Sequence, residues 1–184
     1  MPNYRRWYIS GGTFLFTLVT CDRRRFLAEE QARNSLRLAI EKVREKLPFE
    51  ITAMVLMLDH LHAVWTLPTG DSNYSLRWKR IKEIFTSNYL AAGGSEVLPN
   101  DSRLHQGERG IWQRRYWEHT VQDEDDLKRC VDYVHWNPKK HGCVSNVRDW
   151  PWSSFHRFVQ AGEYTLDWGA EDPCPRYDKP EWGE

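Results

Sequence analysis

The sequence lacks the features of a membrane, secreted or strongly basic protein. No apolar run approaches the roughly 20 residues that a membrane-spanning helix needs, and the chain opens without the apolar stretch of a secretory leader. The four cysteines form no Cys-x-x-Cys pair, which argues against a disulfide framework or a ribbon-type zinc site. Basic and acidic residues both number 26, so the net charge is zero. These absences favour a cytoplasmic protein.

The 184 residues are enough for one domain with its own core, followed by a tail. Residues 163–184 hold seven acidic and two basic residues together with three prolines. We therefore expect a domain over 1–160 and an irregular acidic tail over 161–184. Such a tail is either a solvated terminus or a segment that competes with a polyanion for a basic groove.

Without that tail, the domain is mildly basic, and its bases occur in clusters close to several of the 10 tryptophans. Each cluster alone is an ordinary solvated patch. Together, basic clusters beside aromatic rings favour a surface that tracks phosphates and stacks on bases. The residues predicted to contact DNA are Arg5, Arg6, Arg23, Arg24, Arg77, Lys79, Arg80, Lys82, Arg114, Arg115, Lys139 and Lys140.

The hydrophobic pattern predicts an α+β protein. Apolar and β-branched runs predict strands over 13–20, 50–58, 61–67 and 115–121. Helical spacing predicts helices over 28–46, 75–92 and 122 to about 136, with Pro138 as the stop, and a loop over 100–110. The order β-α-β-β-α-β-α is that of a ferredoxin-like fold, a four-stranded antiparallel sheet with helices on one face. The last helix would lie beside the sheet and present a residue to its surface.

His60-Leu61-His62 is the first candidate for chemistry. In a strand, residues two apart point to one face, so both imidazoles could reach one divalent ion. By itself, a His-x-His pair is more typical of two polar residues on a half-exposed strand. The apolar surroundings of this pair favour a site, because unpaired imidazoles would be costly to bury there.

Tyr133 and Asn137 form the second candidate, because residues four apart share one face of a helix. Spacing alone fits an ordinary core tyrosine just as well. Combined with the two histidines, however, the phenol and the amide oxygen make a reasonable phosphodiester-cutting site. A metal would polarise the phosphate, and the tyrosine oxygen would attack phosphorus to form a covalent intermediate.

With these motifs the sequence resembles the REP-associated tyrosine transposases, bacterial relatives of the single-tyrosine insertion-sequence transposases. The resemblance covers about residues 4–158 and leaves out the acidic tail. It is carried by ordered motifs at 4–6, 11–17, 57–65, 111–119, 133–142 and 152–155, which include Met57-Leu-Asp-His-Leu-His62 and Tyr133-Val-His-Trp-Asn-Pro138.

The resemblance implies a HUH nuclease fold with His60 and His62 as the paired metal ligands, Tyr133 as the nucleophile and Asn137 as a further ligand. It implies Mg²⁺ or Mn²⁺ as the ion. The implied partner is single-stranded DNA with REP-type hairpins, cut to leave a 5′-phosphotyrosine and a free 3′-OH. We expect a nucleoid-associated protein in the cytoplasm, with a monomer favoured over a dimer. His119 is expected to make a structural hydrogen bond.

Two alternatives stay open at this stage. The chain could bind REP hairpins without cutting them, as an architectural or regulatory protein. It could also be a replication initiator or relaxase, although 184 residues leave no room for a helicase domain.

Overall fold

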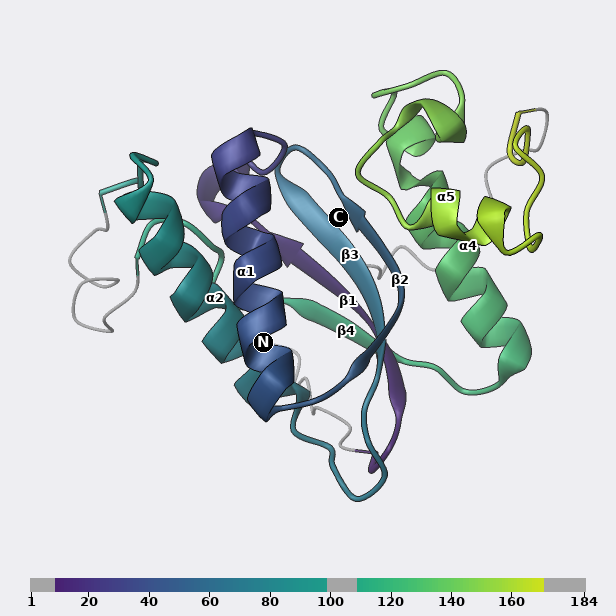
Figure 1. Ribbon diagram of the computed structural model, residues 1–184, viewed down its shortest axis with the longest axis horizontal. Coiled ribbons are helices and arrows are strands. Elements are labelled where there is room, and N and C mark those ends of the chain that lie inside the picture. Colours follow the sequence, from purple (N-terminus) through teal and green to yellow (C-terminus); the bar gives the residue numbers. More distant parts are fainter. Residues whose placement is uncertain (1–8, 99–108, 171–184) are drawn as a thin grey trace, which may run out of the picture.

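The computed structural model describes residues 9–98 and 109–170. Its centre is a four-stranded antiparallel sheet in the order β2-β3-β1-β4 (Figure 1). The strands are β1 (Thr13–Val19), β2 (Glu50–Leu56), β3 (His60–Thr66) and β4 (Trp117–Thr120). This strand order confirms the predicted ferredoxin-like arrangement. Most of the predicted loop over 100–110 lies outside the described residues. The predicted DNA-binding bases Arg5 and Arg6 lie outside them as well.

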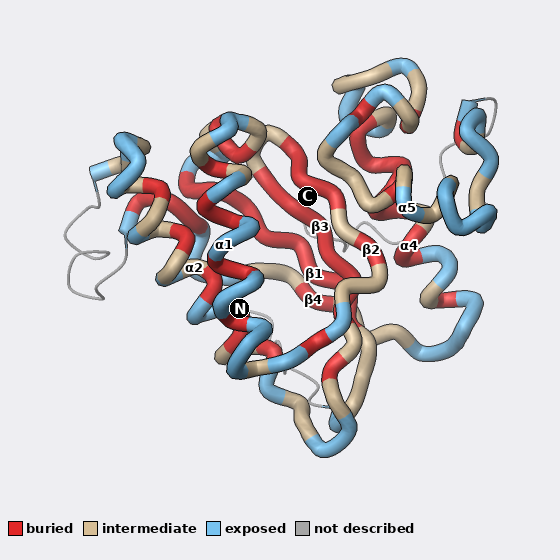
Figure 2. Tube along the Cα trace, in the orientation of Figure 1, coloured by how far each residue is buried: buried red, intermediate tan, exposed pale blue. Residues whose placement is uncertain are grey.

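Helices cover both faces of the sheet, and not one face as predicted (Figure 1). Helices α1 (Glu30–Lys46) and α2 (Tyr74–Ala91) pack on one face. Helix α4 (Glu124–Lys140) packs on the other, and α5 (Phe155–Gln160) follows it. The physical reason is that alternate residues of the central strands are apolar on both sides, so each side needs a cover. Figure 2 accordingly shows the central strands β1 and β3 almost wholly buried between the helices.

The register of the strands decides which side chains reach α4. Thr17 of β1 lies opposite His62 of β3 on one side and Trp117 of β4 on the other. Because side chains alternate along a strand, His60 lies on the same face as His62. That face also carries Val64, which belongs to the core cluster beneath α4. The two histidines therefore point toward α4.

Helix α4 begins where the sequence predicts and ends later. Asp123 caps it, since its side chain accepts from the Asp126 N–H, and three acidic residues fill the first turn. Pro138 lies inside the helix, which continues to Lys140. Proline removes one backbone hydrogen bond, but the buried Trp136, Asn137 and Pro138 hold the last turn against the protein. The prediction that Pro138 ends the helix was therefore wrong.

The first ten residues of the expected tail pack against α4 and its surroundings. Tyr164 donates to the Asp132 carboxylate, and Asp167 pairs with Arg148. Trp168 contacts the ring of Trp136 edge-on. Residues 161–170 therefore lie on the domain, whereas most of the acidic residues of the tail fall outside the described residues.

Candidate active site

Oxygen atoms on neighbouring segments orient the two histidines of β3. The His60 Nδ1 lies 2.6 Å from Asp59 Oδ1, and the His62 Nδ1 lies 2.8 Å from Thr17 Oγ1. Both imidazoles are buried, with exposed fractions of 2% and 0%. A carboxylate only accepts, so the His60 Nδ1 donates and its Nε2 is left to bind another group. Partners of this kind are how proteins orient histidine ligands of a metal.

Helix α4 brings Tyr133 and Asn137 to these histidines. The ring centroids of Tyr133 and His62 are 5.1 Å apart, and Asn137 Oδ1 lies 3.2 Å from His60 Nε2. The spacing of four residues along the helix does place both side chains on one face, as the sequence predicts. All four side chains are buried and come together in one chain.

The donor set fits a divalent ion. Two imidazole nitrogens and an amide oxygen are suitable ligands for Mg²⁺ or Mn²⁺. Adjacent ligands of an octahedral ion lie about 3 Å apart when each is about 2.1 Å from the metal. The 3.2 Å between His60 Nε2 and Asn137 Oδ1 is close to that separation. His60, His62 and Asn137 are therefore the residues that could hold the ion.

Asp59 supplies a negative charge directly behind His60. Burial by itself raises the pKa of this carboxyl, but its hydrogen bond with His60 and its pairing with Arg23 outweigh burial, so the pKa lies below the usual range. The Arg23 guanidinium lies 3.4 Å from Asp59 Oδ2. Asp59 is thus a carboxylate that accepts from His60 and connects the site to an exposed arginine.

Sequence reasoning did not assign roles to Thr17, Asp59 or His141. The contact of Thr17 with His62 depends on strand register, which the sequence pattern does not give. His141 caps α4, and its ring centroid lies 4.9 Å from that of His60. The sequence could have pointed to His141, because Tyr133, Asn137 and His141 follow one another at intervals of four and so share one face of a helix.

Arg77 does not fit the predicted DNA surface. Its side chain is only 1% exposed. Its guanidinium donates to the carbonyls of Pro48 and Asn73 and to the Asp71 carboxylate, at 2.7–3.0 Å. The charged group of this residue is used inside the protein, where it ties the start of α2 to the turns around it.

The other predicted DNA-binding bases among the described residues differ in how far their side chains are exposed. Three are half-buried and donate to backbone oxygens: Arg24 to Ser95, Lys82 to Gln113, and Lys139 to Gly169 and Ala170. Six are exposed: Arg23, Lys79, Arg80, Arg114, Arg115 and Lys140.

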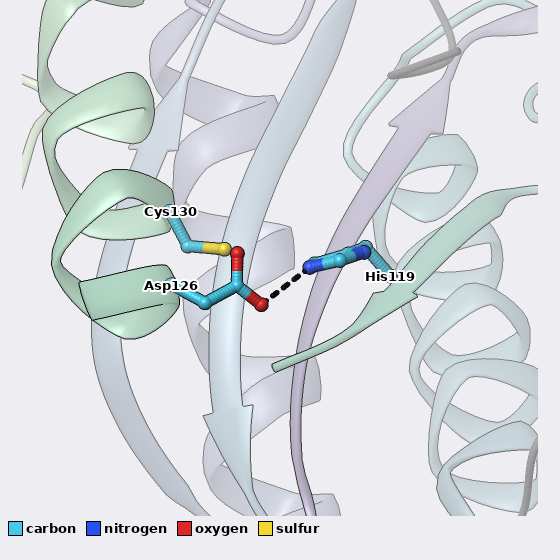
Figure 3. A group of neighbouring side chains, drawn as sticks. All are labelled: His119, Asp126 and Cys130. Carbon is cyan, nitrogen blue, oxygen red and sulfur yellow. Dashed lines mark hydrogen bonds and ion pairs between the residues drawn. The ribbon is translucent and has the colours of Figure 1, made fainter. Parts of the chain in front are cut away.

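A second group of metal-ligand-type side chains joins β4 to α4 (Figure 3). Donor atoms of His119, Asp126 and Cys130 lie within 4.8 Å of one another, so the group has the composition to hold an ion. His119 donates to Asp126 Oδ2 at 2.7 Å, which is a structural hydrogen bond of the kind expected for it. The same carboxylate accepts from the Gln122 N–H and from Arg129. Burial raises the pKa of the Cys130 thiol.

Comparison with known proteins shows the family of the chain. The family model described as "Transposase IS200 like" matches residues 10–137. A REP-associated tyrosine transposase of Escherichia coli K12 is 43% identical over 171 residues, which cover 93% of each chain. The chain belongs to the REP-associated tyrosine transposase family. A relative from Haemophilus influenzae is 41% identical over 176 residues, covering 92% of this chain and 94% of its own.

A solved structure of a REP-associated tyrosine transposase bound to a REP hairpin has the same fold. Its TM-score is 0.76 at 42% identity, and the match covers 94% of this chain and 95% of that one. Membership places the chain in a transposase family, and so among enzymes. No helix among the described residues is long and apolar enough to cross a membrane.

Proposed function

We propose that this chain is a metal-dependent single-stranded DNA endonuclease and strand transferase that acts at REP-type hairpins. The observation that carries the proposal is the meeting, within one chain, of Tyr133 with His62 and of Asn137 with His60. Cleavage through a covalent phosphotyrosine needs a tyrosine nucleophile beside nitrogen and oxygen donors that can bind a metal ion. The relative bound to a REP hairpin supports hairpin DNA as the substrate.

In the proposed reaction, the Tyr133 oxygen attacks the phosphorus of one phosphodiester linkage. A bond between phosphorus and the tyrosine oxygen forms as the bond to the 3′ oxygen breaks, leaving a 5′-phosphotyrosine and a free 3′-OH. The phenol loses a proton and the leaving 3′ oxygen takes one up. Attack of a 3′-OH on the phosphotyrosine reverses the exchange and can join a different strand without nucleotide hydrolysis.

His60, His62 and Asn137 would hold the Mg²⁺ or Mn²⁺ ion, which when bound would polarise the phosphate and offset charge in the transition state. Asp59 and Thr17 keep the two imidazoles in the orientation that such binding needs. The ring of Tyr133 lies against that of His62, which supports its oxygen as the nucleophile for a phosphate bound there.

The test uses the full chain and a labelled single-stranded REP hairpin from the genome that encodes it. With Mg²⁺ or Mn²⁺, we expect a protein–DNA band on a denaturing gel. The band should disappear in EDTA and in the Tyr133→Phe variant, which should still bind the hairpin. Firm hairpin binding without any covalent band would instead identify a hairpin-binding protein that does not cut.

A further inference from the structure

The last turn of α4 carries two adjacent lysines whose side chains go to different places. Lys139 donates to the carbonyls of Gly169 and Ala170 at 2.6 and 2.9 Å, and its ammonium lies 4.6 Å from the ring centre of Trp136. Adjacent helical residues point about 100° apart. The two lysines therefore contact different neighbours, although the sequence places them in one basic cluster.

Lys140 is directed toward the nucleophile. Its ammonium lies 5.0 Å from the centre of the Tyr133 ring. Tyr133, Asn137 and Lys140 are spaced by four and then three residues, so they follow one stripe of the helix. Lys140 is exposed, whereas Tyr133 and Asn137 are buried. The stripe thus runs from the buried site to solvent and ends in a positive charge.

A positive charge at this position matches the needs of phosphoryl transfer. Negative charge spreads over the non-bridging oxygens of the phosphate in the transition state, and protein cations stabilise it there. A lysine ammonium is a compact charge on a flexible stem, suited to binding a phosphate oxygen. Since the Tyr133 oxygen must contact the phosphorus, an ammonium beside the tyrosine ring is within reach of that same phosphate.

We propose that Lys140 is a catalytic residue that binds a non-bridging oxygen of the scissile phosphate beside Tyr133. This inference rests on the proposed function and makes it more specific. Among the bases predicted to contact DNA, it gives Lys140 a distinct task. Its loss should affect the linkage that is cut, and not hairpin binding in general.

The first experiment measures formation of the covalent adduct in a single turnover. Lys140→Met should slow the adduct about 100-fold, because removal of one preorganised charge contact commonly costs that much. Lys140→Arg should recover part of the rate. Lys128→Met is the matched control, because Lys128 carries the same charge on the same helix. Lys128 lines a groove with Asp132 and Arg157, and Tyr133 is not among the residues that line this groove. This variant should react like the wild type.

The second experiment measures binding instead of activity. The 3′-OH fragment released by the wild type identifies the scissile linkage, and two hairpins are then made that differ only there, with a phosphodiester or an uncharged methylphosphonate. In EDTA, where cleavage stops, the wild type should bind the methylphosphonate hairpin about tenfold more weakly. Lys140→Met should bind both hairpins equally, and Lys128→Met should keep the wild-type difference.

The outcomes separate the two proposals. Absence of an adduct with the wild type would overturn the proposed function, and this inference with it. An adduct that forms normally in Lys140→Met, or a methylphosphonate difference that persists in that variant, would overturn the role of Lys140 alone. Similar losses in Lys128→Met and Lys140→Met would also overturn it, since they would indicate a general effect of charge.

Discussion

The two histidines of the site depend on oxygens that lie elsewhere in the sequence. The His-x-His pair could be predicted from sequence because strand alternation is a local property, and both rings do lie on one face. The contact between Thr17 and His62 could not, because it joins strands 45 residues apart in a register that the sequence does not specify. The same holds for the buried Arg77, whose partners come from two segments, Pro48 and the stretch from Asp71 to Asn73.

Removing the Thr17 hydroxyl tests its part in orienting His62. Thr17→Val keeps the shape of the side chain, and we expect about tenfold weaker Mn²⁺ binding, as for other partners of metal-binding histidines. Titration calorimetry with Mn²⁺ would measure it. Thr13→Val is the control, since Thr13 lies on the same strand and its hydroxyl contacts Thr66. Equal Mn²⁺ affinity in Thr17→Val and the wild type would contradict this role.

The location of the metal is tested by comparing the two groups that could hold one. His62→Ala should abolish high-affinity Mn²⁺ binding, because it removes a nitrogen donor from the site beside Tyr133. Cys130→Ala should bind Mn²⁺ like the wild type, since Mn²⁺ prefers oxygen and nitrogen to sulfur. Equilibrium dialysis would show both results. Loss of binding in Cys130→Ala alone would instead place the ion between β4 and α4.

At the scale of elements, the candidate site requires α4 to lie at one position on the sheet. The sequence predicts the helix from its acidic start and its apolar spacing, but its alignment depends on tertiary contacts. One of them is the hydrogen bond of His119 on β4 with Asp126 in the first turns of α4. The length of the helix also depends on packing, since buried neighbours keep it helical past Pro138. Local rules could not predict either outcome.

Asp126→Ala should therefore destabilise the protein. It leaves the Gln122 N–H and the His119 ring without their shared acceptor, and we expect a loss of about 2 kcal/mol in the free energy of unfolding. Urea denaturation would measure the loss. Asp125→Ala is the control, because Asp125 is an exposed acid in the same turn and should cost less than about 1 kcal/mol. Equal losses in the two variants would mean that the contact with β4 contributes little.

At the scale of the whole molecule, the sheet separates the candidate site from the predicted basic helix. Lys79 and Arg80 lie on α2, across the sheet from α4 (Figure 1). The exposed Arg114 and Arg115 precede the edge strand β4. A DNA strand that contacts both α2 and Tyr133 must pass an edge of the sheet, and the edge at β4 carries these bases. The sequence predicts basic clusters but cannot show which side of the sheet they occupy.

The fold also bears on whether one chain or two chains together form a working site. Because Tyr133 meets His62 within one chain, we expect each chain to act with its own tyrosine. An equimolar mixture of Tyr133→Phe and His62→Ala should then form no covalent adduct on a denaturing gel. The wild type at the same total concentration should form it. Recovery of the adduct in the mixture would show that two chains share their sites.

The proposed cleavage through Tyr133 is tested by finding the residue that becomes linked to DNA. After reaction with a REP hairpin and Mn²⁺, nuclease and trypsin would leave a peptide carrying a short nucleotide remnant, which mass spectrometry can locate. We expect the remnant on Tyr133, in the peptide 130–139, joined through a 5′-phosphate. A remnant on another tyrosine, or cleaved DNA without any linked peptide, would contradict the proposed cleavage.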